Sequence, residues 1–459
     1  MKHLKKAKII LVPYPAQGHV SPMQKLAWAF LSHGFEPVIV LPQCIHGQIL
    51  LNADYSDHGI KWVALPDGQA QEGDTGPDFF AIESAMENTM PTHLQHLLRK
   101  LAKDGDVACL VVDLLASWAI EVAHTCAIPV AGFWPAMLAS YLLIASIPHM
   151  LFRGLISDTG VPQYEGKIHF EPELPVISTE DLPWLIGTDA ARKARFKFWK
   201  RTMERSSNLK WVLVNSFPDE MANKCGSQGC GPHVLPIGPI CMHQLTKTIS
   251  FWEEDLSCMK WLENQKPDSV VYISFGSWVS PIGDAKLRNL ALALEASARP
   301  FIWVLRSTWL QGLPVGFLER VVKQGIGRVV SWAPQTQILQ HQSVACYLTH
   351  CGWNSILEAL QFQKKLLCYP VAGDQFVNCA YVVKVWRVGL KLNGLGHKDV
   401  EEGVLKVMED EEMSSRLNKL YQRIMGMQGD NIKGAFVFKT FLEDLKNPSS
   451  TTIICQNSS

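Results

Sequence analysis

The segment from Trp332 to Gln375 constrains the fold of this chain most strongly, because it places a helical pattern between two short apolar runs. The runs cover Ala345 to Thr349 and Leu366 to Tyr369, and the helical pattern begins at Asn354 or Ser355. A strand, a tight turn, a helix and a second strand in this order predict a β-α-β unit. The start of such a helix favours an anion such as phosphate, because its first N–H groups have no partners within the helix and the helix dipole is positive there.

The residues around this helix start also fit arrangements without a ligand. Ser355 and Glu358 have the spacing of a capping box, in which both side chains bond N–H groups of their own helix. Trp332 fits either a packed core or a platform for a flat ring, and His350 fits a histidine whose hydrogen bonds are satisfied inside the protein. Spacing alone leaves both interpretations open.

The same segment resembles the signature box of plant-type UDP-glycosyltransferases over its whole length of 44 residues. The matching residues are Trp332-Ala333-Pro334-Gln335, His341, Thr349-His350-Cys351-Gly352-Trp353-Asn354-Ser355, Glu358, Pro370 and Asp374-Gln375. The resemblance implies that Trp332 stacks on uracil, next to Ala333 and Gln335, and that Glu358 holds the ribose hydroxyls.

The resemblance also implies which residues hold the rest of a UDP-sugar. His350, Asn354 and Ser355 would hold the diphosphate. The sugar would contact Trp353, Asp374 and Gln375, and glutamine at the last position usually accompanies glucose donors in that family.

Two departures from the family pattern concern this site. Gln363-Lys364-Lys365 stands where relatives usually carry Gly-Val-Pro, so we expect the helix to lack its left-handed glycine cap. Pro135 stands where relatives often carry a serine or threonine that touches the sugar, and proline has no N–H or hydroxyl to donate.

The length and charge of the whole chain exclude several classes of protein. Its 459 residues, 47% of them hydrophobic, exceed what one core normally supports, so we expect two domains. The 43 basic and 43 acidic residues give a net charge of zero, which argues against a nucleic-acid partner. The apolar run Ile9 to Val12 is too short for a signal core, and Ala131 to Met150 contains prolines and a histidine, so we expect no integral membrane segment.

Twelve cysteines are scattered without the spacing of a metal site. Cys109, Cys346 and Cys368 lie inside apolar runs, which indicates buried free thiols in a reducing compartment. We therefore expect a soluble, cytoplasmic monomer.

The N-terminal part predicts a second β-α-β unit and a general base. A strand at Ala7 to Val12 leads into a loop at Pro13 to His19, and a buried strand at Val107 to Val112 ends at Asp113. Ligand chemistry gathers beyond the carboxyl ends of parallel strands, so His19 and Asp113 suit a base and the carboxylate that orients it. The alternatives are a loop histidine and an aspartate that caps a helix starting at Leu114. Pro15-Ala16-Gln17-Gly18-His19-Val20 and Val111-Val112-Asp113 also resemble the catalytic loop and strand of the same family.

Landmarks along the chain predict the domain boundaries. We expect an N-terminal acceptor-binding Rossmann-like domain over residues 1–240, a polar linker over 241–254 and a C-terminal UDP-sugar-binding Rossmann-like domain over 255–435. A helix and tail over 436–459 would return to the first domain, as in the family. The strand Ser269 to Ser274 continues into Phe275-Gly276-Ser277, which resembles the phosphate-touching loop of the family, so Ser277 joins the predicted site.

Asp104-Gly105-Asp106 has the spacing of a metal-dependent glycosyltransferase, but it precedes its strand and so lies at the wrong end of the sheet. A turn explains it better. We expect no metal and no cofactor, because a UDP-sugar is a co-substrate.

Together these features predict an α/β protein of the GT-B type, with two Rossmann-like domains that face each other across a cleft. The predicted partners are UDP-glucose and a small lipophilic acceptor, such as a plant secondary metabolite or hormone. His19 would remove a proton from the acceptor hydroxyl, and the helix start near Asn354 would stabilise the departing diphosphate of an inverting hexose transfer.

Three other classes compete with this prediction. A nicotinamide oxidoreductase would carry Gly-x-Gly-x-x-Gly after the first strand, where only Gly18 is present. A sugar-nucleotide epimerase would share the fold and donor site but lack the signature box. A non-catalytic UDP-sugar-binding protein would be expected to lack His19 or Asp113.

Overall fold

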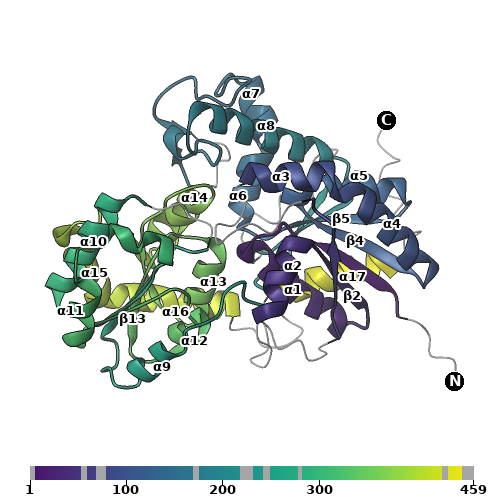
Figure 1. Ribbon diagram of the computed structural model, residues 1–459. Helices are drawn as coiled ribbons and strands as arrows, with labels where there is room; N and C mark the ends of the chain where they lie inside the picture. Colours follow the sequence, from purple (N-terminus) through teal and green to yellow (C-terminus); the bar gives the residue numbers. More distant parts are fainter. Residues whose placement is uncertain are drawn as a thin grey trace. The chain divides into compact units, whose positions relative to one another are not determined.

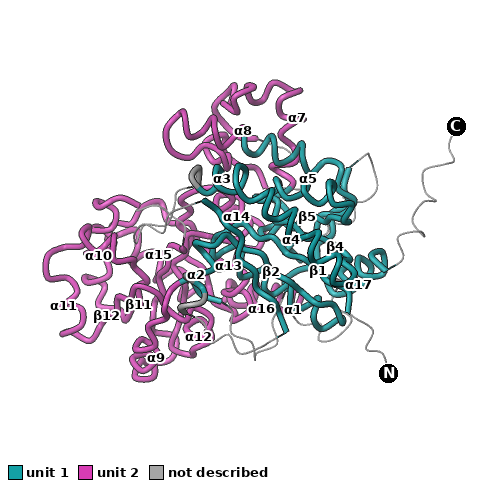
Figure 2. Tube along the Cα trace, turned by 45° about the vertical axis from the view of Figure 1, so that its right-hand side comes forward, with its two compact units in different colours: residues 1–141, 198–251, 428–459 teal, residues 142–197, 252–427 magenta. Residues whose placement is uncertain are grey.

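The computed structural model describes residues 6–52, 59–68, 79–168, 175–217, 231–240, 249–277, 282–425 and 433–446. The chain divides into two compact units, which Figure 2 shows in different colours. Unit 1 comprises residues 1–141, 198–251 and 428–459, and unit 2 comprises residues 142–197 and 252–427. Residues 142–197, which we expected in the N-terminal domain, thus group with unit 2. Parts of the predicted linker (241–248) and tail (447–459) lie outside the described residues.

Unit 1 is built on a sheet in which every neighbouring pair of strands is parallel (Figure 1). The strand order is β3-β2-β1-β4-β5-β8-β9. The strands are β1 (Lys8–Val12), β2 (Glu36–Pro42), β3 (Lys61–Leu65), β4 (Val107–Asp113), β5 (Val130–Trp134), β8 (Trp211–Val214) and β9 (His233–Pro236). β1, β5 and β8 are buried along their whole length, as expected for a parallel sheet that helices cover on both faces.

The helices of unit 1 include one from the far end of the chain. They are α1 (Gln17–Ser32), α2 (Gln43–Asn52), α3 (Phe79–Asn88), α4 (Met90–Lys103), η1 (Leu114–Ala116), α5 (Trp118–Thr125) and α17 (Lys433–Lys446). The ring of Phe438 in α17 lies 5.2 Å from that of Phe30, and the ring of Phe441 lies 5.4 Å from that of Trp211. Phe436, in the same helix, is 67% exposed.

Unit 2 contains a second parallel sheet with the strand order β12-β11-β10-β13-β14-β15. These strands are β10 (Val270–Ser274), β11 (Phe301–Val304), β12 (Gly327–Val330), β13 (Val344–Thr349), β14 (Lys365–Cys368) and β15 (Gly389–Lys391). A short antiparallel pair, β6 (Lys167–Ile168) and β7 (Ile177–Ser178), belongs to the same unit.

The helical elements of unit 2 follow the β-α alternation that the sequence predicted. They are α7 (Ile147–Phe152), η2 (Thr179–Asp181), α9 (Ser257–Leu262), α10 (Asp284–Ser297), η4 (Ser307–Gly312), α11 (Phe317–Lys323), α12 (Gln335–Gln340), α13 (Trp353–Gln361), α14 (Gln375–Ala380), η5 (Tyr381–Val385), α15 (His397–Glu409) and α16 (Glu411–Met425). Two helices, α6 (Leu138–Ala145) and α8 (Asp189–Ser206), contain residues of both units. In the described part of the chain, no helix combines the length and apolarity that a bilayer span requires.

The predicted strands match the observed ones to within two residues, whereas two helix starts differ. Helix α1 begins at Gln17, so His19 lies in the first turn of a helix and not in a loop as we expected. Ala16 is extended, and its carbonyl oxygen accepts N–H bonds from both His19 and Val20 at 2.9 Å. Backbone bonds of this kind begin a helix without a side-chain cap, which explains why the residue types did not reveal the start.

The end of α13 keeps a left-handed cap without glycine. Gln363 has a φ of +51°, and the N–H of Lys364 donates to the carbonyl oxygen of Ala359 at 2.8 Å. These are the marks of a Schellman motif, with glutamine in the position that usually carries glycine. Because a side chain disfavours this backbone conformation, the cap costs about 1 kcal/mol relative to glycine.

Candidate active site

Unit 1 brings His19 and Asp113 into contact at the carboxyl ends of two neighbouring strands, β1 and β4. The Nδ1 atom of His19 lies 2.7 Å from Oδ2 of Asp113. The carboxylate is fully buried, whereas the imidazole is 23% exposed. A carboxylate can only accept, so Nδ1 carries the proton and Nε2 keeps a lone pair. This geometry suits a general base.

Asp113 both contacts His19 and caps η1, because its two oxygens have different partners. Oδ1 accepts the N–H of Leu115 at 3.0 Å and caps η1, while Oδ2 bonds His19 and accepts the N–H of Tyr14 at 3.3 Å. The cap and the Tyr14 N–H fix the carboxylate, and the carboxylate fixes the ring of His19.

The helix that carries His19 is also held by a segment that follows more than 200 residues later. Gln17 donates to the carbonyl oxygen of Ile249 at 2.7 Å and accepts the N–H of Phe251 at 2.8 Å. One turn further along α1, Gln24 accepts the N–H of Ile249 at 2.9 Å. Sequence analysis missed these contacts, because a glutamine beside an apolar stripe gives no sign of a distant partner.

In unit 2 the turn between β13 and α13 leads into the helix start at which we predicted an anion site. Helix α13 begins at Trp353 with Gly352 as its N-cap, one or two residues before the predicted start. Asn354 and Ser355 therefore lie in its first turn, where the helix dipole is positive. This first turn can bind the diphosphate of a nucleotide.

His350 is buried at this turn with one ring nitrogen unbonded. Its side chain is only 8% exposed, and Nδ1 has no hydrogen-bond partner among the described residues. A Cβ atom at Gly276 or Gly352 would lie 2.5 or 2.4 Å from its Nε2, so both glycines are needed to admit the ring. Burial lowers the pKa of His350 to about 4, so the imidazole is neutral at pH 7. A neutral ring with a free nitrogen can bind a phosphate oxygen through an N–H bond but adds no charge.

The amide of Gln335 connects four other side chains of unit 2. Its Nε2 donates to Oε2 of Glu358 at 2.6 Å and to the hydroxyl of Ser355 at 3.2 Å. Its Oε1 accepts the hydroxyl protons of Tyr272 at 3.1 Å and Tyr347 at 3.0 Å. The two tyrosines were not predicted, because only the folded sheet brings β10 and β13 side by side.

These bonds rule out the capping box that the spacing of Ser355 and Glu358 allowed. Neither side chain caps α13, since its N-cap is Gly352 and no side-chain cap bond is present. Gln335 instead holds both, and it aligns the Glu358 carboxylate. A carboxylate held in this way can accept bonds from the two hydroxyls of a ribose.

Trp332 lies just after β12 and packs against Trp252. Their ring centroids are 4.5 Å apart with an angle of 45° between the planes, and the guanidinium of Arg306 lies 4.4 Å from the Trp252 ring. The N–H of Asp255 donates to the carbonyl oxygen of Trp332 at 3.1 Å. Trp332 is half-buried, so part of its indole can serve as a stacking surface.

Two of the three residues predicted at the sugar, Asp374 and Gln375, make different hydrogen bonds. Oδ2 of Asp374 accepts an N–H from Asn378 at 2.9 Å. Oε1 of Gln375 accepts the N–H groups of Val371 and Ala372, both at 2.9 Å. The carbonyl of Gln375 is therefore used by the turn, and its NH₂ group remains as a donor beside the acceptor Asp374.

The remaining predicted residues are placed as follows. The indole of Trp353 is 4% exposed and lies 6.4 Å from that of Trp386, so any contact with a sugar must come mainly from its backbone. Ala333 is 6% exposed, and its carbonyl oxygen accepts the N–H of Gln335 at 2.8 Å. Ser277 follows β10, and the next four residues lie outside the described residues.

Two groups of residues are relevant to metal binding. Asp104 and Asp106 lie in a turn before β4, at the end opposite Asp113, where the Asp106 carbonyl oxygen accepts the Lys8 N–H at 2.8 Å. The turn predicted there is confirmed. Within the described residues, the one group of side chains close enough to share a metal ion is formed by three cysteines of unit 2, Cys351, Cys368 and Cys379.

Unit 1 also contains a small open pocket, which starts at the loop before α1. Its lining residues are Pro15, Pro42, Cys44, Ile45, Asp67, Ile82, Ala85, Met86 and Met90. Most of these side chains are apolar, and Asp67 is a buried carboxylate that accepts the N–H of Cys44 at 3.0 Å.

Comparison with known proteins shows what the chain is similar to. Residues 242–423 match the family model described as UDP-glucoronosyl and UDP-glucosyl transferase. The chain is 53% identical to UDP-glycosyltransferase 82A1 of Arabidopsis thaliana, over 93% of this chain and 96% of that protein. It is 28% identical to Linamarin synthase 1 of Manihot esculenta, over 88% of both.

Solved structures show the same fold at lower sequence identity. Medicago truncatula UGT71G1 complexed with UDP-glucose superposes with a TM-score of 0.80 at 22% identity, over 97% of this chain and 100% of that chain. Phytolacca americana UGT2 complexed with UDP-2fluoro-glucose and pterostilbene also gives a TM-score of 0.80, at 23% identity, over 96% of this chain and 100% of that chain.

Proposed function

Because the chain belongs to the UDP-glycosyltransferase family, we propose that it transfers glucose from UDP-glucose to a hydroxyl of a small lipophilic acceptor, with inversion at the anomeric carbon. It is a glycosyltransferase with the predicted GT-B fold of two Rossmann-like units. The epimerase and the non-catalytic binding protein are not favoured by this membership. The observation that carries the mechanism is the 2.7 Å bond between His19 and the buried Asp113.

His19 acts as the base in this proposal. Nε2 takes the proton of the acceptor hydroxyl as the oxygen attacks the anomeric carbon from the face opposite UDP. Asp113 holds the tautomer that leaves Nε2 unprotonated and stabilises the imidazolium that forms. A single displacement of this kind inverts the anomeric carbon.

The start of α13 and His350 stabilise the leaving UDP. Negative charge grows on the diphosphate as the glycosidic bond breaks, and the positive end of the helix dipole meets it. His350 is neutral and donates one N–H bond, and Asn354, Ser355 and Ser277 complete the polar surroundings. We propose that Trp332 stacks on uracil and that Glu358, aligned by Gln335, accepts the ribose hydroxyls.

Asp374 and Gln375 select the sugar. One carboxylate acceptor beside one amide donor can bind two neighbouring hydroxyls of fixed orientation, and an epimer leaves one of these groups unpaired. Glucose, with equatorial hydroxyls, is the hexose we propose for this pair. Trp353 contributes its backbone at the helix start.

The acceptor binds in unit 1, at the apolar pocket beside the loop before α1. The side chains of Ile82, Met86 and Met90 provide an apolar surface, and methionine adapts to molecules of different shape. The Phytolacca americana relative is complexed with pterostilbene, which supports a small aromatic or otherwise lipophilic acceptor. We further propose a cytoplasmic monomer whose reaction needs no metal or cofactor.

The test is a screen of small hydroxylated acceptors with UDP-glucose, in which mass spectrometry detects the glycosylated product. UDP-galactose, UDP-xylose and UDP-glucuronate are compared under the best acceptor, and we expect UDP-glucose to react fastest. His19→Ala should lower kcat by about 10²-fold or more while the Kd for UDP stays nearly unchanged. A clear preference for another donor refutes glucose, and undiminished turnover of His19→Ala refutes the base.

A further inference from the structure

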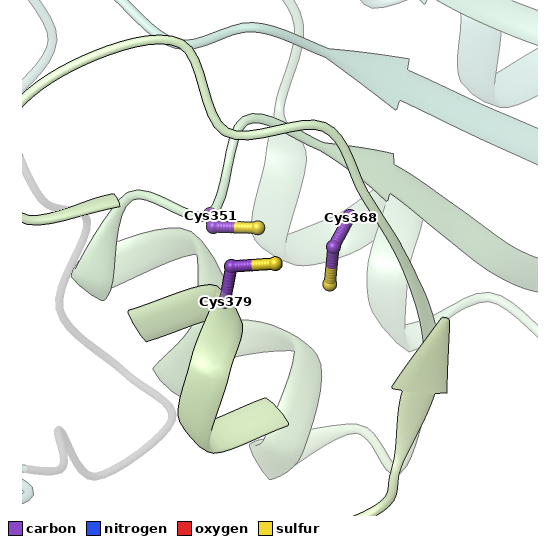
Figure 3. Close-up of side chains that lie close together, drawn as sticks. All are labelled: Cys351, Cys368 and Cys379. Carbon is purple, nitrogen blue, oxygen red and sulfur yellow. The ribbon is translucent and has the colours of Figure 1, made fainter. Parts of the chain in front are cut away.

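Three cysteines from three different elements of unit 2 meet in its interior. Figure 3 shows Cys351 in the turn after β13, Cys368 at the end of β14 and Cys379 in α14, with their sulfur atoms turned toward one another. The three Sγ atoms all lie within 4.8 Å of one another. None of the three residues is more than 3% exposed, and all are free thiols.

From this geometry, we propose that Cys351, Cys368 and Cys379 form a three-coordinate site for a soft monovalent cation of the Cu⁺ type. Thiolates are the protein ligands that soft cations prefer. With metal–sulfur bonds of about 2.3 Å, the sulfurs of a trigonal site lie about 4 Å apart, so the three side chains need to approach one another by less than about 1 Å. Small rotations about the Cα–Cβ bonds supply such shifts.

The number of ligands favours Cu⁺ over Zn²⁺. Structural zinc is almost always four-coordinate, with cysteine, histidine or carboxylate ligands. Among the residues that the structure describes, no fourth side chain of these types joins the three cysteines. A cation that accepts three sulfur ligands therefore fits better.

Cation binding at this site would release protons. Thiolates, and not thiols, are the metal ligands, so a bound cation displaces the S–H protons of the three cysteines to solvent.

A cation bound by the three cysteines would affect the elements that we propose bind UDP-glucose. This part of the inference depends on the proposed function. Cys351 follows His350 directly and has a φ of +67°, so its backbone is held in the left-handed region. Asn378 donates to the Cys351 carbonyl oxygen at 3.0 Å and to Asp374 Oδ2 at 2.9 Å. A cation that draws the three sulfurs together therefore shifts both the diphosphate turn and the sugar pair. We expect it to weaken UDP-glucose binding.

The first experiment measures binding without using activity. Fully reduced, full-length protein is mixed anaerobically with Cu⁺ and a coloured Cu⁺ chelator, and the copper withheld from the chelator is counted. We expect the wild type to withhold one equivalent more than Cys368→Ala or Cys379→Ala. Cys346→Ala, which removes a buried thiol from the neighbouring part of β13, is the matched control and should retain it. A second control, Cys225→Ser with Cys230→Ser, removes a closely spaced pair elsewhere in the sequence and should also retain it.

The proposal is overturned if the wild type withholds no copper, if Cys346→Ala loses the equivalent, or if the Cys225 and Cys230 substitutions abolish it. X-ray absorption of the wild type with one equivalent of copper should show three sulfur neighbours, and this result does not depend on any variant folding. Two sulfurs, or nitrogen and oxygen neighbours, would contradict the site.

The second experiment measures the effect on the donor. One equivalent of Cu⁺ should raise the KM for UDP-glucose several-fold in the wild type and leave that of Cys368→Ala unaffected. An unchanged KM with the site filled would overturn the effect on the donor. If the chain does not transfer glucose, the copper measurement still tests the cysteine site, because it does not depend on activity.

Discussion

The substitution Asp113→Asn separates the two functions of this carboxylate. An asparagine in the same orientation keeps an oxygen for the Leu115 N–H, so η1 remains capped. It places an NH₂ group opposite Nδ1 of His19, which favours the tautomer with the proton on Nε2 and removes the base. A flipped amide would restore the contact with His19 but lose the cap, and in both orientations the negative charge is gone.

The expected size of the effect follows from the distance. An imidazolium and a carboxylate joined by a 2.7 Å bond have their charges about 4 Å apart, which corresponds to about 4 kcal/mol at the effective dielectric constant of ~20 that reproduces measured pairs. This energy stabilises the transition state and not the ground state, so kcat should fall by about 10³-fold. The Kd for UDP should change little, and the Tm should fall only slightly, through the loss of the long Tyr14 N–H bond to Oδ2.

The assay is the initial rate at saturating UDP-glucose and acceptor, with UDP binding measured by calorimetry and Tm by circular dichroism. Asp113→Ala is the comparison, since it removes the cap together with the charge and should also lower the Tm. A kcat of Asp113→Asn within tenfold of the wild type would refute the role of the charge. A lost UDP affinity in this variant would show that the substitution acts on the fold.

Four further predictions test other parts of the structure. Treatment with EDTA should leave full activity; a loss that Mg²⁺ or Mn²⁺ restores would contradict the metal-free reaction. Gln375→Glu keeps the oxygen that Val371 and Ala372 use but replaces the donor, so the KM for UDP-glucose should rise about tenfold, and an unchanged KM would contradict the contact. Gln363→Gly should stabilise unit 2 by about 1 kcal/mol in thermal unfolding with unchanged kinetics, whereas a lower Tm would disprove strain at the cap. The pKa of His350 is about 4 in the folded protein and 6.5 in the unfolded chain. Lowering the pH from 6.5 to 4 should therefore reduce the free energy of unfolding of the wild type by about 3 kcal/mol relative to that of His350→Gln. Parallel curves of the free energy of unfolding against pH would refute a buried neutral ring.

The sheets and the placement of His19 and Asp113 at one sheet edge were accessible from the sequence because they depend on local patterns. Runs such as Val107 to Val112 are bounded by turn residues and too short for helices, which identifies strands. His19 and Asp113 follow strands that the β-α order makes parallel, so both lie at one edge of the sheet. Their contact needed the additional fact that β1 and β4 are neighbours.

The partners of the site residues were not accessible, because they depend on tertiary geometry. Gln335 matched the signature box, but nothing in its spacing shows that its amide joins Tyr272 to Glu358. Three of the six strands of the second sheet lie between Trp252 and Trp332 in sequence. The cysteines of the cluster have no metal-type spacing and meet only when β14 and α14 pack beside the turn after β13.

The short segment from Ile249 to Trp252 has a consequence for building chimeras from relatives. Gln17 and Gln24 hold Ile249 and Phe251 on the helix of His19, and the next residue, Trp252, packs against Trp332. A crossover within these four residues would combine α1 from one parent with part of a segment that packs on the α1 helix of the other parent. We expect a junction before residue 249 to be tolerated only when the parent that supplies residues 249–252 also carries glutamine at the positions of Gln17 and Gln24.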